Sequence, residues 1–178
     1  MTRVDVMGCT WTQDFSFSSA TIHAAFASAT RDSPCYGFSG HNFKNRDDLL
    51  RQLLDYWAHE LTAVVTVNPQ LLALKPKSRL TRTAEMILDY ELTRYEIAIR
   101  QWAVQDTEAG RAVRKVNRIR LDFVRKALSE LGFTGDDLEM RTMLFVCYQS
   151  WESPMFREIS LKRRRQLIAK RIELITSR

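Results

Sequence analysis

Residues 106–131, DTEAGRAVRKVNRIRLDFVRKALSEL, carry the clearest structural signal in the sequence. Asp106 or Thr107 is a suitable N-cap residue, and Gly132, directly after the stretch, is a typical residue for ending a helix. Between these two signals, apolar side chains recur every three or four residues, as one buried face of a helix requires. We therefore predict a long helix that reaches Leu131, with an inner face of Ala112, Val116, Ile119, Phe123, Ala127 and Leu131.

Helical periodicity continues on both sides of this stretch. A helix after Asn45 is predicted to end at Asn68–Pro69, because proline cannot continue the backbone hydrogen-bond ladder. Two more helices precede the long one, around residues 80–88 and 93–105. After it, Gly135 opens a helix that Ser153–Pro154 should break, and a last helix should run from Phe156 to Thr176. No alternating strand pattern of useful length occurs, so the predicted fold class is all-α.

Composition and charge narrow the class of protein. The 178 residues are enough for one hydrophobic core, and no run approaches the roughly 18 apolar residues of a membrane span. The N-terminus lacks the apolar segment of a secretory signal. Cys9, Cys35 and Cys147 are odd in number and show no C-x-x-C spacing, which favours reduced thiols in a cytoplasmic protein. The net charge of +6 favours polyanions, although much of it lies in residues 111–126 and 157–171, where basic faces of solvated helices explain it.

The chain changes character near residue 42. Residues 1–42 contain no leucine, lysine or glutamate, whereas the rest is rich in leucine, arginine and glutamate. This contrast predicts a helical domain over residues 43–178, preceded by an atypical N-terminal segment over residues 1–42.

Two blocks of the sequence resemble TetR-family transcriptional regulators. FKNRDDLL (43–50) and RQLLDYW (51–57) resemble the start of the family's fourth helix, which joins the DNA-binding head to the body. The block YEIAIRQWAVQDTEAGRAVRKVNRIRLDFVRKALSELGFTGDDLEMRTMLF (95–145) resembles the order of the body helices: an A-I-R-x-W-A helix, an acidic break, and a long basic helix ending in an E-L-G-F turn. The resemblance covers residues 37–178.

The resemblance implies an all-helical homodimer in which a small, mostly apolar ligand controls binding to double-stranded DNA. The last two long helices would form a four-helix dimer interface, and the middle helices would enclose the ligand pocket, with polarity from tyrosine hydroxyls, His59 or Arg100. The expected interface residues are Met140, Leu144, Cys147, Trp151, Ile168 and Ile172, beside Leu161 and Ile175; the expected pocket residues are Trp57, Met86, Tyr90, Tyr95, Trp102 and Phe123.

The DNA-binding head is where the sequence departs from the family. The family's G-S-F-Y-x-H-F is GFSGHNF here (37–43), so Gly40 replaces the phosphate-contacting tyrosine and Asn42 the histidine. The helix-turn-helix turn falls at residues 32–34, where Pro34 would disturb entry to a recognition helix. The expected DNA contacts are Gly40, His41, Lys44 and Arg46. Two explanations stay open: residues 1 to about 36 reflect a reading-frame or start-site artefact or a degenerate gene, or the head has diverged.

Other function classes find less support in the sequence. Cys35 with His23 or His41 is the one arrangement that could suggest a nucleophile, and no phosphate-binding, dinucleotide or G-x-S-x-G motif occurs, so we expect no enzyme and no cofactor. His59 lacks a second ligand at metal-binding spacing apart from Asp55, so no metal is expected. The alternative to a regulator is a dimeric helical interaction or ligand-binding protein that has lost DNA binding.

Overall fold

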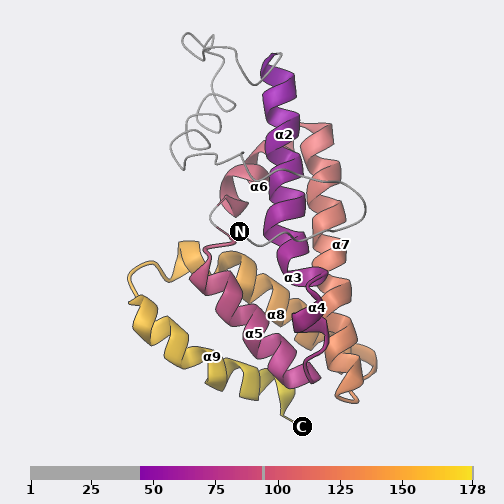
Figure 1. The fold of residues 1–178 in the computed structure, drawn as a ribbon, viewed down its shortest axis with the longest axis vertical. Coiled ribbons are helices and arrows are strands. Elements are labelled where there is room, and N and C mark those ends of the chain that lie inside the picture. The colour runs from indigo at the N-terminus through magenta and orange to yellow at the C-terminus, as the bar shows by residue number, and fades with distance from the viewer. Residues whose placement is uncertain (1–44, 94, 178) are drawn as a thin grey trace. The chain divides into compact units, whose positions relative to one another are not determined.

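The structure is a computed structural model that describes residues 45–93 and 95–177, and every regular element in these two ranges is a helix (Figure 1). The all-α prediction is therefore confirmed for them. The chain divides into two compact units, Met1–Leu50 and Arg51–Arg178. The expected boundary at residues 42 and 43 lies outside the described residues. Within the described part of the chain, no helix is both long and apolar enough to cross a membrane.

The first described helix, α2, is followed by a change of helical pitch. α2 covers Arg46–Ala58, and its start is capped by Asn45, whose side-chain oxygen accepts a hydrogen bond from the backbone of Asp48 at 2.9 Å. A π-helical turn, η1 (His59–Ala63), then leads into α3 (Val64–Thr66). The sequence pattern predicts an unbroken helix here. Because a π-turn is wider than an α-turn, η1 changes the direction in which the following side chains point.

Prolines begin the next two helices. α4 covers Pro69–Leu72, with Asn68 as its N-cap, and α5 covers Pro76–Asp89. Proline suits the first helical position because its missing N–H would have no intrahelical partner there. The preceding helical segment does end before Asn68–Pro69, as predicted.

The long helix α7 (Thr107–Glu130) follows α6 (Glu96–Gln105) and has the predicted signals at both ends. The Asp106 carboxylate accepts a hydrogen bond from the backbone of Ala109 at 2.8 Å. At the other end, Gly132 has a positive φ of 88°, and the N–H groups of Gly132 and Phe133 donate to the carbonyls of Ser129 and Leu128. This is a Schellman motif, which requires a residue that tolerates the left-handed region.

The last two helices differ from the predicted bounds. α8 covers Gly135–Met155 and keeps Pro154 in its final turn, so it ends one residue beyond the predicted break at Ser153–Pro154. Pro154 falls in the final turn, and the bond from the Phe156 N–H to the Glu152 carbonyl, 3.0 Å, still closes the helix after it. α9 covers Leu161–Thr176 and begins five residues later than predicted, where the Ser160 hydroxyl caps it.

The hydrophobic core forms where these helices meet. α7 packs against α6, α8 and α5, and α5 also packs against α9. Figure 1 shows α5 between α8 and α9. The main core cluster draws buried residues from all four of α5, α7, α8 and α9 and from the α7–α8 turn: Leu80, Ala84, Val124, Ala127, Leu128, Phe133, Phe145, Ile168, Ile172 and Ile175.

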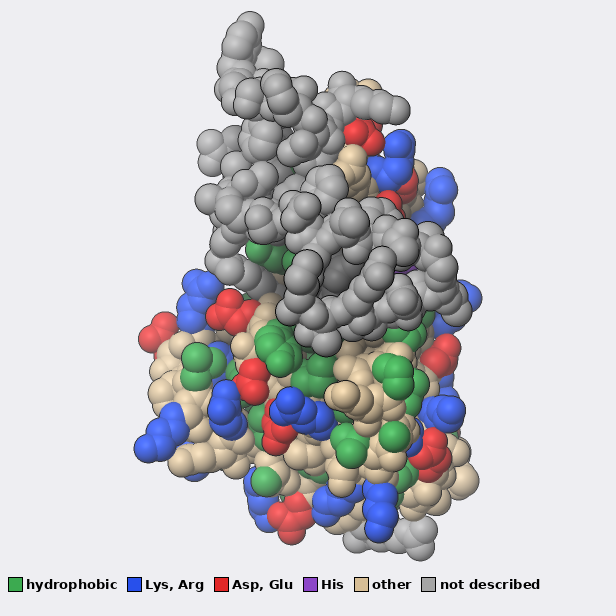
Figure 2. Space-filling model, in the orientation of Figure 1, with side chains coloured by type: hydrophobic (Ala, Val, Ile, Leu, Met, Phe, Trp, Pro, Cys, Tyr) green, Lys and Arg blue, Asp and Glu red, His purple; other side chains and the backbone are tan. Residues whose placement is uncertain are grey.

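Charged side chains of both signs are interspersed over the face shown in Figure 2, which includes α5 and α9. Arg165 of α9 forms an ion pair with Asp89 of α5, and Lys170 forms one with Glu173 at 2.9 Å. This pattern supports the interpretation of residues 157–171 as a solvated basic face.

A buried carboxylate on α6 forms ion pairs that connect α6 to α7. The Glu96 side chain is 1 % exposed and accepts hydrogen bonds from Arg100, at 2.6 and 3.0 Å, and from Arg120, at 2.9 and 3.0 Å. Arg100 also donates to Asn117 of α7 at 2.9 Å. A buried charge is tolerated only when it is paired and hydrogen-bonded, and Glu96 meets this condition through two guanidinium groups.

Replacing Glu96 with alanine should lower the free energy of unfolding by about 3 kcal/mol, because two arginines would lose a buried partner. The matched control is Glu85→Ala, which removes an exposed pair with Arg82 and should cost at most about 1 kcal/mol. Urea unfolding of both variants measures the difference. Equal losses for the two variants would mean that the Glu96 cluster does not hold α6 and α7 together.

Candidate ligand-binding cavity

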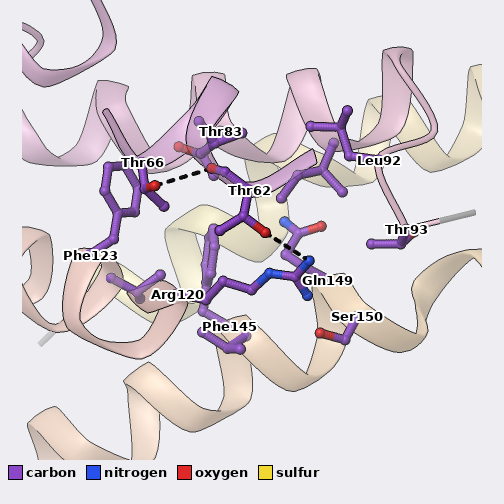
Figure 3. A pocket seen from close by; sticks show the side chains of 14 residues that line it. Thr62, Thr66, Thr83, Leu92, Thr93, Arg120, Phe123, Phe145, Gln149 and Ser150 are labelled. Atoms are coloured by element: carbon purple, nitrogen blue, oxygen red, sulfur yellow. Dashed lines mark hydrogen bonds between the residues drawn. The ribbon is translucent and has the colours of Figure 1, made fainter. Parts of the chain in front are cut away.

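A cavity of about 50 Å³ lies among η1, α3, α5, α7, α8 and the turn that precedes α6 (Figure 3). Half of its wall is apolar, and this half comes from core positions of the surrounding helices. The other half consists of four threonines, one serine, one glutamine and one arginine. The wall residues are Thr62, Val65, Thr66, Thr83, Ile87, Leu92, Thr93, Arg120, Phe123, Val124, Phe145, Val146, Gln149 and Ser150.

Two of the polar wall residues have buried atoms without a hydrogen-bond partner. Thr83 on α5 is 2 % exposed and Gln149 on α8 is 6 % exposed. The hydroxyl oxygen of Thr83 and the amide nitrogen of Gln149 find no partner among the described protein atoms. A buried polar group left in this state costs about 1–3 kcal/mol. Such groups call for an explanation, and a bound molecule in the adjoining cavity supplies one.

Other polar groups on the cavity wall already have hydrogen-bond partners within the protein. The Thr66 hydroxyl donates to the backbone carbonyl of Thr62 at 3.1 Å. Arg120, besides its bonds to Glu96, reaches the Thr62 hydroxyl at 3.4 Å, and its guanidinium carbon lies 5.4 Å from the centre of the Trp57 ring. Figure 3 shows Thr62, Thr83, Arg120 and Gln149 entering the cavity region from four different elements. The Arg120 position is therefore fixed by α6, η1 and Trp57 together.

The cavity is small for a ligand pocket. One water molecule needs about 10–15 Å³ of such volume, so 50 Å³ accommodates a few waters or a compound of a few non-hydrogen atoms. Pockets for drug-sized ligands are typically about 300–1,000 Å³. A larger ligand would require the surrounding helices to separate.

Of the six residues expected to line a pocket, the structure brings one, Phe123, to the cavity wall. Trp57 is buried beneath Arg120, and Met86 belongs to a small core cluster with Val65, Leu71 and Leu92. The remaining three lie off the wall: Tyr90, 62 % exposed at the end of α5, and Tyr95 and Trp102, both half-buried.

The two residues expected to give the pocket polarity also lie elsewhere. Arg100 is bound to Glu96 and Asn117, and His59 is exposed at the start of η1. None of the seven polar wall residues was identified from the sequence: Thr62, Thr66, Thr83, Thr93, Arg120, Gln149 and Ser150. Such residues could have been found in the sequence as polar side chains on an otherwise apolar helical face. Thr83, for example, shares a helical face with Leu80 and Ile87.

Several predicted sites fall outside the described residues. Gly40, His41 and Lys44 do so, as do Cys35 and His23; for Arg46, only its place at the start of α2 is described. Among the residues that the structure does describe, no group of three or more metal-ligating side chains is brought together.

A second feature is an exposed apolar stripe on α8. Met140, Leu144 and Trp151 are 56 %, 56 % and 42 % exposed, and Cys147, a free thiol, is also exposed. Met143 and Met155, which the sequence analysis did not include, extend the same helical face. We call these six residues the α8 stripe. Beside it, a hydrogen bond from Arg125 lowers the pKa of the Glu139 carboxyl below its ordinary value.

Ile168 and Ile172 of α9, also expected at the dimer interface, have a different place. They are 3 % and 1 % exposed and belong to the main core cluster of their own chain. The α9 face that carries them packs against α5, so little of their surface is left for a partner. The exposed apolar surface available to a partner is therefore the α8 stripe and not the face that carries Ile168 and Ile172.

Replacing Thr83 with valine should raise the free energy of unfolding by about 1 kcal/mol, because the substitution removes an unpartnered buried hydroxyl at nearly constant volume. Thr66→Val is the matched control on the same wall; it removes a satisfied hydroxyl and should lower the free energy by about 1 kcal/mol. Urea unfolding distinguishes the two. A loss for Thr83→Val as large as that for Thr66→Val would show that the Thr83 hydroxyl has a structural partner.

Comparisons with known proteins return no match of any of the three kinds: no family model, no curated protein and no solved structure. The resemblance to TetR-family regulators therefore rests on the sequence blocks quoted above. The chain's own geometry provides the remaining support for a function.

Proposed function

We propose that the chain is a homodimeric regulator of the TetR type, whose binding to DNA is controlled by a small molecule in the cavity. The observation that carries the proposal is the pair of unpartnered polar groups, on Thr83 and Gln149, at the wall of a cavity whose other half is apolar. A protein that only needed a stable core would gain from apolar residues at both positions. A ligand that provides the missing hydrogen bonds would explain why both positions are polar.

The location of the cavity supports a regulatory role. Thr62 belongs to η1, which continues directly from α2, the helix whose sequence resembles the connection to the family's DNA-binding head. π-turns inside helices occur frequently at functional sites. A ligand that favours one arrangement of η1 would shift the balance between alternative orientations of α2, the helix that continues into η1.

The α8 stripe supports dimerisation. Its members recur at helical spacing over 16 residues, or roughly 24 Å, and they include no charged side chain. Contiguous apolar patches on a protein surface commonly mark association sites. In an isologous dimer the same patch faces itself across a two-fold axis, and Cys147 lies near the middle of the stripe. The occupant that we propose is therefore a second copy of this chain, with its Cys147 close to that of the first.

DNA binding is the part of the proposal that depends most on the resemblance. It is tested by fluorescence anisotropy of the full chain with DNA from its own upstream region and with a random duplex of equal length. Tighter binding to the upstream DNA that persists at physiological salt is expected of a working regulator. Weak binding that is equal on both duplexes and lost as salt rises would leave the alternative, a dimeric ligand-binding or interaction protein without DNA recognition.

Replacing Trp151 with aspartate should convert the dimer into a monomer, because the interface would bury an unpaired charge. Light scattering after size-exclusion chromatography should give twice the chain mass of 20.8 kDa for the unmodified protein and 20.8 kDa for the variant. The control is Val104→Asp, which places the same charge at a position that is 83 % exposed on α6 and off the stripe. Loss of the dimer in both variants, or in neither, would contradict this interface.

Cross-linking through Cys147 tests the two-fold arrangement directly. With Cys9 and Cys35 changed to serine, a short bismaleimide linker should join two chains, since the thiol is exposed near the centre of the stripe. The control moves the cysteine to position 104 by Val104→Cys with Cys147→Ser. If the dimer forms but cross-links only through position 104, a different surface makes the interface.

A further inference from the structure

We propose that the cavity binds an uncharged compound of a few non-hydrogen atoms, whose carbonyl or hydroxyl oxygen accepts a hydrogen bond from the side-chain amide of Gln149. The inference rests on the proposed ligand-binding function and adds the chemical class of the ligand. The Gln149 amide nitrogen can only donate, so its partner must be an acceptor. The Thr83 hydroxyl can donate or accept, which suits either kind of oxygen.

The charges around the cavity favour an uncharged ligand. Arg120 is the charged residue on the described wall, and both carboxylate oxygens of Glu96 are already bound to it. A carboxylate ligand would lose its hydration and would have to compete with Glu96 for the Arg120 guanidinium group, and that loss is costly. A cationic ligand would face Arg120 with no carboxylate on the described wall to offset the repulsion.

The apolar wall residues and the volume of the cavity indicate the apolar part and the size of the ligand. Ile87, Leu92, Phe123 and Val146 offer surface for a short alkyl group. A purely apolar ligand would leave Thr83 and Gln149 without partners, so it would gain less than an oxygen-bearing one of equal size. With about 50 Å³ available, a compound with a short alkyl chain and one oxygen fits the cavity more closely than an aromatic or drug-sized molecule.

The test follows the side-chain amide signal of Gln149 in ¹H–¹⁵N NMR spectra of the full chain, assigned by its disappearance in Gln149→Leu. 2-Butanone is the uncharged probe, and butyrate and butylammonium are charged probes of similar size. Butanone should shift the Gln149 signal in a saturable way, and the charged probes should bind at least tenfold more weakly.

Variants then identify the groups that hold the probe, with affinity read from the methyl signals of Leu92 and Val146. Gln149→Leu and Thr83→Val should each weaken butanone binding about fivefold, the usual effect of losing one hydrogen bond. Gln101→Leu, an exposed position on α6, is the matched control and should leave the affinity unchanged. Unchanged affinity in Gln149→Leu would overturn the inference even if butanone binds.

The other outcomes of the titrations show whether the ligand class is wrong or the proposed regulatory function is wrong. Tighter binding of butyrate or butylammonium than of butanone would overturn the uncharged class while leaving a ligand site in the same cavity. Absence of saturable shifts with all three probes would overturn the class and size proposed here. The DNA and dimer measurements use none of these probes, so failure of the regulator proposal would appear there independently.

Discussion

Burial of the Glu96 carboxylate between Arg100 and Arg120 is the constraint on which the rest of the site depends. At 1 % exposure this charge must keep both guanidinium partners, so α6 and α7 have one favourable register. The same contacts fix Arg120 over the Trp57 ring and within reach of Thr62. One ion cluster thus sets the position of the charged residue on the cavity wall and occupies its guanidinium group. The class of ligand that we propose follows from that pairing.

The sequence predicted helices well where local chemistry fixes them. Asp106 and Gly132 bound α7 because a cap and a left-handed turn are properties of a few neighbouring residues. The sequence predicted the exact helix bounds and changes of helical pitch less well. Pro154 lies inside α8, one residue before its end, since a proline in the last turn removes only one backbone hydrogen bond. The π-turn η1 left no signal in the periodicity of the apolar residues.

The candidate site was less accessible from the sequence than the fold. Helical periodicity shows which residues share a face, but it does not show what covers that face. Ile168 and Leu144 are both apolar at helical spacing, yet one lies in the core and the other is 56 % exposed. Similarly, the aromatic residues expected to line a pocket mostly pack elsewhere, whereas Thr83 and Gln149 were overlooked because a polar residue among apolar neighbours carries a weak local signal.

The cavity and the α8 stripe combine into one functional proposal. The stripe would join two copies through α8, and the cavity would receive the ligand beside η1, on the helical segment that continues from α2. Coupling between them requires that a ligand binds one arrangement of the helices better than another. The cavity is small enough that opening or closing around a ligand would move helices that share the main core cluster.

The proposed function requires the cavity to be a binding site and not a packing defect. The most direct measurement compares thermal unfolding of the unmodified chain and of Ser150→Leu, which fills the cavity at a residue 4 % exposed, across a library of small compounds. We expect at least one compound, at about 100 times its Kd, to raise the Tm of the unmodified chain by roughly 5–10 °C and to leave that of a cooperatively unfolding Ser150→Leu unchanged. A library in which no compound raises the Tm, or in which every active compound stabilises both proteins equally, would contradict it.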